Sequence, residues 1–416
     1  MAERTPARAP RGTEDVMAPD TARWQHLLLE VAGVSGRAGY ARLRSPLVET
    51  ADLVRHVVGD EAIVEVRAPG SDERLALTPG VAASAARAFA QHGPATPWKV
   101  WSLQTCLALA DDGPPVQRNE VALQALGSTD PDLDVEVITV AVDLLAALGL
   151  ARPTLVLNSL GTLSDRRRYV EALRAWLADR RDELPDADRR LAATSPLKVL
   201  ASTDPDTRSL LAGAPRSLDG LSDDGRAHLE KVQEGVGAAG IDYLLDHRVA
   251  GGSPHAVQVV FELQADDDTV LVSGGRHEGM VEDLGGPATP GVGWRSVIES
   301  LLDAGAAAEA GHPGDEVDVF VVDLTGGSVA RDLTRVLRRQ GVRADRAFDD
   351  RSMRAQMKAA DRSGAAVAVI VGEQEQAQGV VALRRLRGDG EGDQTTVPAD
   401  DVVPAVRAAL APPREV

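Results

Sequence analysis

The stretch SGGRHEGMVEDLGGPATPGVGW, Ser273–Trp294, is the densest glycine run in this chain. It follows AVQVVFEL (256–263), whose alternating side chains predict a β-strand, and a short acidic turn, QADDD (264–268). Glycines at this density let a backbone approach a ligand closely. The stretch therefore predicts one wall of a ligand pocket built on a sheet, and the rest of the chain decides whether that pocket still works.

Composition bounds the class of protein. The chain has 416 residues, of which 44% are hydrophobic, which is enough for a buried core in two or three domains. Its one cysteine, Cys106, allows no internal disulfide, so we expect a reduced, cytoplasmic setting. The first 16 residues contain no apolar core, so we expect no signal peptide. No apolar run reaches about 18 residues, so we expect no membrane span.

The net charge of −18 argues against a general nucleic-acid binder. The charge is uneven, because residues 315–416 hold 15 Lys and Arg against 17 Asp and Glu, a balance of −2. The remaining residues therefore carry −16 of the total. If any part of the chain contacts nucleic acid, the C-terminal part has the better electrostatics.

Hydrophobic periodicity divides the chain into two kinds of fold. Before the break GHPGDE (311–316), strand patterns surround a long helical stretch. After the break, strands and helices alternate, which predicts an α/β domain with a parallel or mixed sheet. In the first part we expect helices at 18–39 and 130–150, a strand at 41–50 with Pro46 at an edge or interface, and strands at 98–109 and 118–128 around the turn 110–117.

Several stretches follow one another along the chain: RLRSPLVETADL (42–53) with VGDEAIVEV (58–66), EVALQALGS (120–128), LVLNSLGTLSDRRRYVEALRAWL (155–177), the glycine run and residues 351–386. In this order they resemble the bacterial histidyl-tRNA synthetase family, which is a family of class II aminoacyl-tRNA synthetases. Residues 42–53 and 58–66 resemble the first class II motif, and residues 120–128 resemble the end of the second. Residues 155–177 resemble the insertion, the glycine run resembles a histidine-specific segment, and residues 351–386 resemble the anticodon-binding domain.

The resemblance implies an α+β fold, with the antiparallel catalytic sheet of a class II synthetase, a helical insertion and a C-terminal α/β anticodon-binding-like domain. The implied domains are 1–152 with 236–312 (catalytic), 153–235 (insertion) and 315–416 (anticodon-binding-like). A cytoplasmic homodimer through the Pro46 segment is also implied. The family joins histidine to ATP, releases pyrophosphate and passes histidine to the 3′ end of tRNA, so ATP and Mg²⁺ are implied if that activity persists.

The family meets the charge of ATP with arginines at three points, and this chain departs from the family at each. Carried over residue by residue, the arginine positions fall on Ala108, Gly251 and Ser300. A glycine against the adenine becomes Val297, and the shortened loop of the second motif carries Asp111 and Asp112, which would repel a triphosphate. Arg118 and Arg295 lie nearby in the sequence, but not at the lost positions.

The side of the pocket that holds histidine is altered as well. The glutamate that pairs with the amino group becomes Gly80, a glutamine becomes Glu120, and a tyrosine becomes His277. Two further tyrosine positions fall on His255 and Ala256. Arg276, in contrast, matches a family arginine. The pocket residues expected from the resemblance are Gly80, Glu120, His255, Gly274, Gly275, Arg276, His277 and Glu278.

Simpler interpretations stay open for these and other residues. The cluster of His255, His277, Glu120 and Glu278 would suit a metal or a new ligand, or it records the drift of an exposed cleft, and no metal site is predicted. Cys106 is expected to be buried filler, and Arg166–Arg168 either contact an acceptor stem or begin a solvated helix. Basic residues of the C-terminal domain would contact RNA or form solvated faces: Arg351, Arg354, Lys358, Arg362, Arg384, Arg385 and Arg387.

Four functional hypotheses are compatible with these departures. The first is a histidyl-tRNA synthetase paralogue that is defective in histidine activation and acts by regulation or by binding tRNA or a protein partner. One known relative of this kind is the regulatory subunit of ATP phosphoribosyltransferase, which usually lacks the anticodon-like domain that this chain keeps. The alternatives are an active histidine–tRNA ligase with an unusual site, a repurposed enzyme acting on another small ligand, and a tRNA-binding protein that uses only its tail.

Overall fold

The structure, a computed structural model, describes residues 7–58, 63–67, 69–70, 72–78, 80–109, 115–150, 152–251, 253–307, 317–348, 351–388 and 390–411. These residues form two compact units, residues 7–15 with 26–307 and residues 16–25 with 317–411. Helix α1 (Asp20–Arg37) contributes to both units. Across these ranges, no helix has the length and apolar character needed to cross a membrane.

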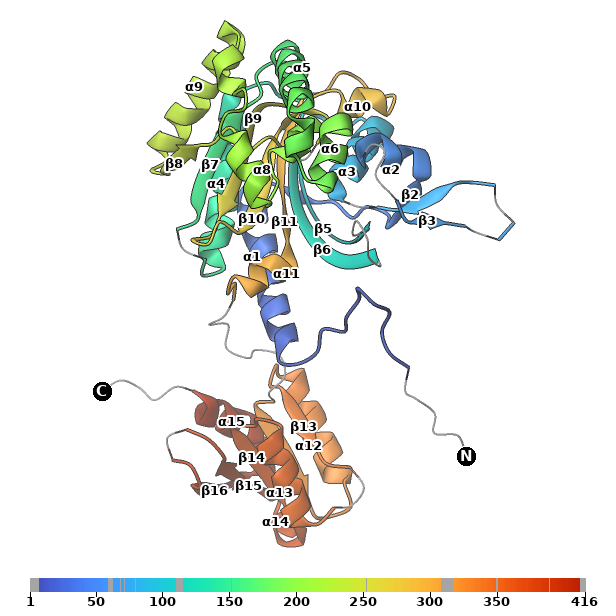
Figure 1. The fold of residues 1–416 in the computed structure, drawn as a ribbon. Coiled ribbons are helices and arrows are strands. Elements are labelled where there is room, and N and C mark those ends of the chain that lie inside the picture. Colours follow the sequence, from blue (N-terminus) through green and yellow to red (C-terminus); the bar gives the residue numbers. More distant parts are fainter. Residues whose placement is uncertain are drawn as a thin grey trace. The chain divides into compact units, whose positions relative to one another are not determined.

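The first unit is built on an eight-stranded sheet with the order β1-β5-β6-β11-β10-β9-β7-β8 (Figure 1). The inner strands pair antiparallel, whereas the edge strands β1 and β8 pair parallel with their neighbours. This arrangement confirms the α+β fold class and the antiparallel sheet implied by the resemblance. The strands are β1 (Ala41–Arg42), β5 (Trp98–Leu109), β6 (Pro115–Leu126), β7 (Thr154–Ser159), β8 (Tyr243–Leu245), β9 (Ala256–Gln264), β10 (Val270–His277) and β11 (Gly291–Val297).

One face of this sheet, here called the α4 face, is covered by helix α4 (Pro131–Ala147), which packs against β6, β10 and β11. The helix begins at Pro131 because Asp130 caps it, with its carboxylate accepting a hydrogen bond from the amide of Asp132. Its apolar stripe, which includes Ile138 and Leu145, is fully buried on the sheet and holds the helix there. Helix α9 (Asp223–Ala238) packs beside α4 and β9.

The opposite face, here called the site face, has helices over both of its ends. Helix α3 (Val81–His92) lies at the β5–β6 end, where its Phe89 packs with Leu126. At the β7–β9 end, apolar side chains of the helices that follow β7 pack on Val156 and Val260. The central strands β10 and β11 lie between these covers. The helices that follow β7 are α5 (Leu163–Asp179), α6 (Asp186–Thr194), α7 (Pro196–Val199) and α8 (Pro205–Leu211).

Two strand predictions need correction. The expected strand 41–50 is divided into β1 and β2 (Val48–Thr50), with Pro46 exposed between them, because proline cannot donate to a sheet and restricts the preceding residue. Strand β6 begins at Pro115, opposite Leu109, rather than after the expected turn, because a first strand position tolerates proline. With β3 (Glu65–Val66) and β4 (Leu75–Leu77), β2 forms a small sheet that packs with α2 (Ala51–Val58).

The second unit is an α/β fold with a mixed five-stranded sheet, β13-β12-β14-β15-β16, as predicted (Figure 1). Strand β12 pairs parallel with β13 and β14, and β15 and β16 add antiparallel strands. Apolar side chains are buried on both faces of β12 and β14, which explains their continuous valine-rich sequences. The elements are β12 (Val319–Asp323), α12 (Ser328–Arg339), β13 (Ala344–Arg346), α13 (Met353–Arg362), β14 (Val367–Val371), α14 (Glu373–Gln378), β15 (Val380–Arg385), β16 (Gln394–Pro398) and α15 (Val402–Leu410).

The domain boundaries inside the first unit stay a prediction. Strand β7, which begins the expected insertion, belongs to the eight-stranded sheet, and the helices after it pack back on that sheet. The stretch from α5 to α9 is helical, in line with the expected character of residues 153–235.

Candidate functional site

Polar side chains form a block on the site face. Residues that are paired across neighbouring strands project to the same side of the sheet, so the register of the strands places these side chains in rows. Ser102, Gln104, Glu120, Gln124 and His277 each have a relative exposure of 8% or less. So many buried polar groups on one sheet face are typical of a binding site rather than of a core. Successive rows are Gln104–Glu120–Val297, Ser102–Ala122–Arg295, Val100–Gln124–Gly293 and Leu126–Gly291–His277.

Glu120 stands beside Gly80, at the beginning of α3. Its Oε1 atom accepts a hydrogen bond of 2.9 Å from the amide of Val81, and it lies 3.3 Å from the place where a Cβ on Gly80 would stand. The guanidinium of Arg295 is 3.5 Å from the other carboxylate oxygen. Burial nevertheless raises the pKa of Glu120 above its usual value. A buried carboxylate is therefore present next to position 80, but it comes from β6 rather than from the segment before α3.

His277 and Gln124 fill the other end of the block. The Nε2 atom of His277 lies 3.1 Å from Oε1 of Gln124, within hydrogen-bond distance, and Nδ1 has no hydrogen-bond partner in the described part of the chain. Burial lowers the pKa of His277 to about 4, with smaller contributions from His255 and Arg276, so the ring is neutral near pH 7. A Cβ on Gly291 would stand 2.3 Å from Cε1 of this ring, so the glycine is needed to admit the histidine.

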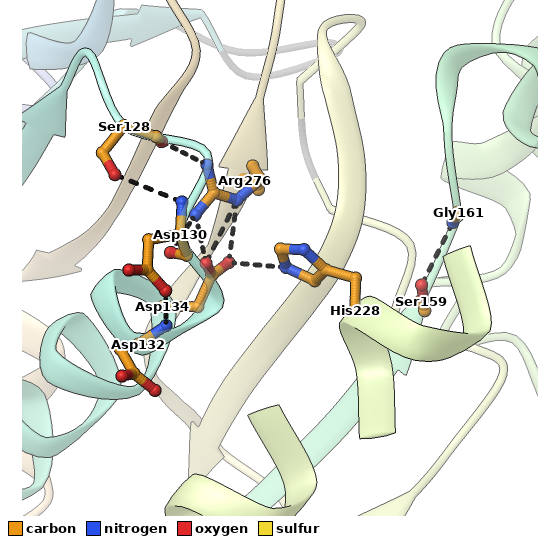
Figure 2. Close-up of polar contacts among 8 residues, drawn as sticks. All are labelled: Ser128, Asp130, Asp132, Asp134, Ser159, Gly161, His228 and Arg276. Atoms are coloured by element: carbon orange, nitrogen blue, oxygen red, sulfur yellow. Dashed lines mark hydrogen bonds and ion pairs between the residues drawn. The ribbon is translucent and has the colours of Figure 1, made fainter. Parts of the chain in front are cut away.

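Arg276 projects to the opposite side, onto the α4 face (Figure 2). Its Nε atom lies 3.1 Å from Oδ2 of Asp134, and its terminal nitrogens donate to the carbonyl oxygens of Ser128 at 2.6 Å and Asp130 at 3.0 Å. His228 of α9 approaches the same carboxylate, with 3.5 Å between Nε2 and Oδ1. The side chains of Arg276 and Asp134 are 1% exposed. Arg276 therefore joins β10 to the start of α4 and does not face the block of polar side chains.

The two glycines before Arg276 also serve packing. A Cβ on Gly274 would stand 2.6 Å from the Phe261 ring on the α4 face. One on Gly275 would stand 2.8 Å from the carbonyl oxygen of Val259, where the register of β9 and β10 shifts. These two glycines therefore allow close strand packing, and only Gly275 belongs to a site-face row.

His255 and Glu278 lie at the rim of the block. His255 precedes Ala256, the partner of His277 across the sheet, and its Nε2 atom is 2.8 Å from Oδ2 of Asp283 in the short helix α10 (Met280–Asp283). The amide of Glu278 donates to the carbonyl oxygen of His255 at 3.1 Å. Within the described ranges, no group of three or more His, Cys, Asp or Glu side chains is placed to hold a metal ion.

Gly251 has a backbone conformation that an arginine would find strained, with φ at +68°. A Cβ here would stand 3.0 Å from Cγ1 of Val260 and 3.1 Å from Cβ of Ala256. Ser300 is half-buried in helix α11 (Ile298–Asp303). The side chain of Ala108 and the pair Asp111–Asp112 lie outside the described residues.

Three residues near the lost arginine positions do lie on the site face. Val297 stands directly opposite Glu120. Arg118 is exposed and pairs across the strands with Cys106, which is buried as predicted, and burial raises the pKa of that thiol strongly. Arg295 has a side-chain exposure of 57%. Two exposed arginines with long side chains, Arg118 and Arg295, therefore lie on this face at positions that do not match the family pattern.

The block contains three residues that sequence reasoning missed, Ser102, Gln104 and Gln124. Gln104 donates from Nε2 to the carbonyl oxygen of Pro46 at 2.9 Å, which joins the site face to the segment between β1 and β2. Gln104 and Gln124 have even residue numbers, as Glu120 has, and project to the same face of the sheet. The alternation of side chains along β5 and β6 could therefore have identified both glutamines.

The second unit holds a cavity of about 440 Å³ that the sequence analysis did not anticipate. Five arginines line it: Arg331, Arg335, Arg338, Arg339 and Arg346. A neighbouring cavity of about 270 Å³ includes Arg351. The other basic residues expected to meet RNA lie on α13, on β15 and after it, and do not line either cavity.

The large antiparallel sheet, its polar site face with glycine-rich central strands, and the separate mixed α/β unit together define a class II aminoacyl-tRNA synthetase fold. A family model described as histidyl-tRNA synthetase matches residues 12–301, and an anticodon binding domain model matches residues 318–409. The chain belongs to the histidyl-tRNA synthetase family.

Individual relatives agree with this assignment. The chain is 35% identical to a histidine–tRNA ligase of Geobacillus kaustophilus over 94% of this chain and 96% of that protein. It is also 35% identical to one of Rubrobacter xylanophilus, over 92% of this chain and 96% of the relative. The structure matches apo histidyl-tRNA synthetase of S. aureus with a TM-score of 0.79 and 26% identity, covering 96% of this chain and 100% of the other.

Proposed function

We propose that this chain is a histidyl-tRNA synthetase family member that no longer activates histidine and acts as a tRNA-binding, regulatory paralogue. The observation that carries the proposal is the state of the phosphate-binding positions. Gly251 has a φ of +68° and neighbours that crowd any side chain, and Ser300 has no cation to offer. Arg276, which matches a family arginine, spends all of its hydrogen bonds on the start of α4.

The chemistry of adenylate formation makes these losses costly. Charge develops on the α-phosphate and on pyrophosphate, and fixed cations must already face it. Removal of one such donor costs about 10²–10³ in rate, although several losses do not simply multiply. The site face instead buries the carboxyl group of Glu120 and the neutral ring of His277, and neither group offers positive charge to a triphosphate.

The tRNA-binding part of the proposal rests on the second unit. This unit matches the anticodon binding domain model. Residues 315–416 have a net charge of −2, against −16 for the rest of the chain, so their arginines are less neutralised by nearby carboxylates. Arg354 and Lys358 are exposed on α13, and neither forms an ion pair within the described ranges. A face of this kind binds the phosphates of RNA with an affinity that falls as salt rises.

The tRNA-binding part is tested with the full chain. Filter binding of tRNA at several salt concentrations should show weaker binding and a shallower salt slope, by about 1 per lost cation, for Arg354→Glu and Lys358→Glu. Arg174→Glu, on the exposed side of α5, is the matched control. Equal binding by all of these variants would remove the second unit as the RNA contact.

The second candidate function is an active histidine–tRNA ligase with an unusual site. The observation that favours it is that Arg118 and Arg295 both project from the site face and are solvent-exposed, so they could meet the phosphates of ATP from new positions. Histidine-dependent ATP–pyrophosphate exchange that disappears in both Arg118→Ala and Arg295→Ala would support this function over the first.

The assembly and setting of the protein belong to the same proposal. A homodimer through the Pro46 segment is supported by the exposure of Pro46 and by Leu47, whose relative exposure is 45%. A cytoplasmic location and a regulated protein partner stay predictions from the family resemblance.

A further inference from the structure

Helix α12 concentrates positive charge on one side. Arg331, Arg335 and Arg339 recur every four residues, and Arg338 follows Arg335 by three, so all four lie toward one side of the helix. Arg346, on the adjacent strand β13, brings to five the number of arginines that line the cavity of about 440 Å³. Within the described residues, Arg339 and Arg346 form no ion pair, whereas Arg331 pairs with Asp332, whose carboxylate also attracts Arg335, and Arg338 pairs with Asp345. The cavity therefore holds at least two guanidinium groups without a carboxylate partner.

An aromatic ring stands at the edge of this cavity. Phe348 has a relative exposure of 58%, which is unusual for a phenylalanine, and it lines both cavities of the unit. The guanidinium carbon of Arg346 lies 4.5 Å from the centroid of the ring. An exposed aromatic ring next to arginines is a surface on which a nucleobase can stack.

A buried hydroxyl faces the same cavity without a partner. Thr334 is 3% exposed and lines the cavity, and its Oγ1 atom makes no hydrogen bond in the described part of the chain. A buried hydroxyl of this kind costs stability unless something satisfies it. A ligand oxygen in the cavity would accept a hydrogen bond from this hydroxyl. Thr334 is thus independent evidence that the cavity is built for a polar ligand.

The neighbouring cavity of about 270 Å³ extends the first. The two share Arg331, Arg346 and Phe348, so one ligand can occupy both. Its wall includes Gly326 and Gly327, which lead into the N-terminus of the twelve-residue helix α12, where backbone amides favour an anion. Among the described residues that line it, the one carboxylate is that of Asp323, which already accepts hydrogen bonds from Thr325 and from the amide of Ala330.

The density of charge distinguishes between ligands. A nucleic-acid strand brings one negative charge per nucleotide, so a single-nucleotide cavity would meet about one phosphate. Five guanidinium groups around about 440 Å³ match a ligand that carries several adjacent charges. We propose that this cavity binds a nucleoside polyphosphate, with the phosphates among the arginines of α12 and the base stacked on Phe348. The site is separate from the site face of the first unit and goes beyond the proposed tRNA binding.

The test measures binding of ATP, GTP, AMP and inorganic tripolyphosphate to the full chain by isothermal titration calorimetry. We expect the nucleoside triphosphates to bind at least tenfold more tightly than AMP. Arg335→Ala and Arg339→Ala should each weaken triphosphate binding about tenfold, the value of one charge-assisted hydrogen bond. Phe348→Ala should weaken ATP and GTP by about tenfold but leave tripolyphosphate unchanged, because the latter has no base. Thr334→Val should weaken all of the triphosphates severalfold.

Controls separate this site from the others. Arg384→Ala, on β15 of the same unit, should bind like the wild type, and so should the double variant Arg118→Ala with Arg295→Ala on the site face. The proposal is overturned if triphosphates do not bind, or if binding is lost in the site-face variant but kept in Arg335→Ala. It is also overturned if Arg335→Ala weakens tRNA binding and no free nucleotide binds, because the cavity then serves RNA. None of these results depends on histidine activation.

Discussion

Replacement of Arg276 by alanine should destabilise the first unit by about 3–5 kcal/mol, which is the usual cost of breaking a buried ion pair. The value follows from the surroundings of the guanidinium. Asp134 is 1% exposed and would keep a buried charge with no guanidinium partner, and the carbonyl oxygens of Ser128 and Asp130 would each lose a donor. An alanine would also leave a void between β10 and α4.

Urea unfolding is the assay, with tryptophan fluorescence as the signal. Trp294 of β11 is 1% exposed and lies across the sheet from Gly274, so it reports on this part of the sheet. The thermal midpoint should fall by roughly 6–10 °C, at about 2 °C per kcal/mol for a unit of this size. The double variant Arg276→Met with Asp134→Leu should recover most of the loss, because it removes both charges.

Arg295→Ala is the matched control, since Arg295 is 57% exposed and its contact with Glu120 is long. It should change the unfolding free energy by less than about 0.5 kcal/mol. The reasoning is refuted if Arg276→Ala costs less than about 1 kcal/mol and instead abolishes binding of a ligand to the site face. Arg276 would then be a pocket residue, as the sequence suggested, and not a joint between β10 and α4.

Three further predictions follow from the site face and the assembly. His277 has a pKa of about 4 in the fold against 6.5 in the unfolded chain, so the unfolded state binds more protons between these values; stability should fall by roughly 3 kcal/mol as the pH drops from about 6.5 to 4, and urea titrations across that window should show no such slope for His277→Phe. Burial raises the pKa of Glu120, so its contribution to stability is fully present below the pKa of the unfolded chain and is lost as the pH rises through the pKa of the folded state. Glu120→Gln keeps an acceptor for the Val81 amide. This variant should unfold at a higher urea concentration than the wild type at pH 7 and at the same concentration near pH 4. Light scattering at micromolar concentration should give twice 43.8 kDa for the wild type and a smaller mass for Leu47→Glu; a wild-type monomer would exclude the dimer.

Much of the fold could be predicted because hydrophobic period and turn residues are local signals. The long strands β5 and β6, helix α4, and the strand–helix alternation of the second unit all follow from such patterns. The division of residues 41–50 was missed because the strand assignment ignored what Pro46 does to the residue before it. The start of β6 was missed because prolines at a strand start look like a turn.

The site was harder to predict, since adjacency in sequence does not place residues on one face. Arg276 and His277 are neighbours, and the family pattern placed both in the pocket. Strand alternation sends them to opposite sides of the sheet, so this part of the error was avoidable. The position of a carboxylate beside Gly80 could not have been predicted, because it depends on the contact between Glu120 of a distant strand and the start of α3.

The arginines of α12 illustrate a different gap. Their three and four spacing was readable, but the cavity also needs Arg346 and Phe348 from β13 and the segment after it, and only the packing of α12 beside β13 brings these together. The sequence interpretation chose the basic residues of α13 and β15 because they repeat the family pattern.

The measurement that tests the central claim most directly is histidine-dependent ATP–pyrophosphate exchange by the purified full chain. The host's own histidyl-tRNA synthetase must be absent from the preparation. The chain should therefore be purified from a host whose enzyme carries an affinity tag, so that the host enzyme can be removed. An active family member is assayed in parallel. We predict no exchange above the background seen without histidine, because the described site supplies no fixed cations at the phosphate positions. Exchange at a rate comparable to the active family member, dependent on histidine and lost in Arg118→Ala or Arg295→Ala, would contradict the account and make this chain a working ligase.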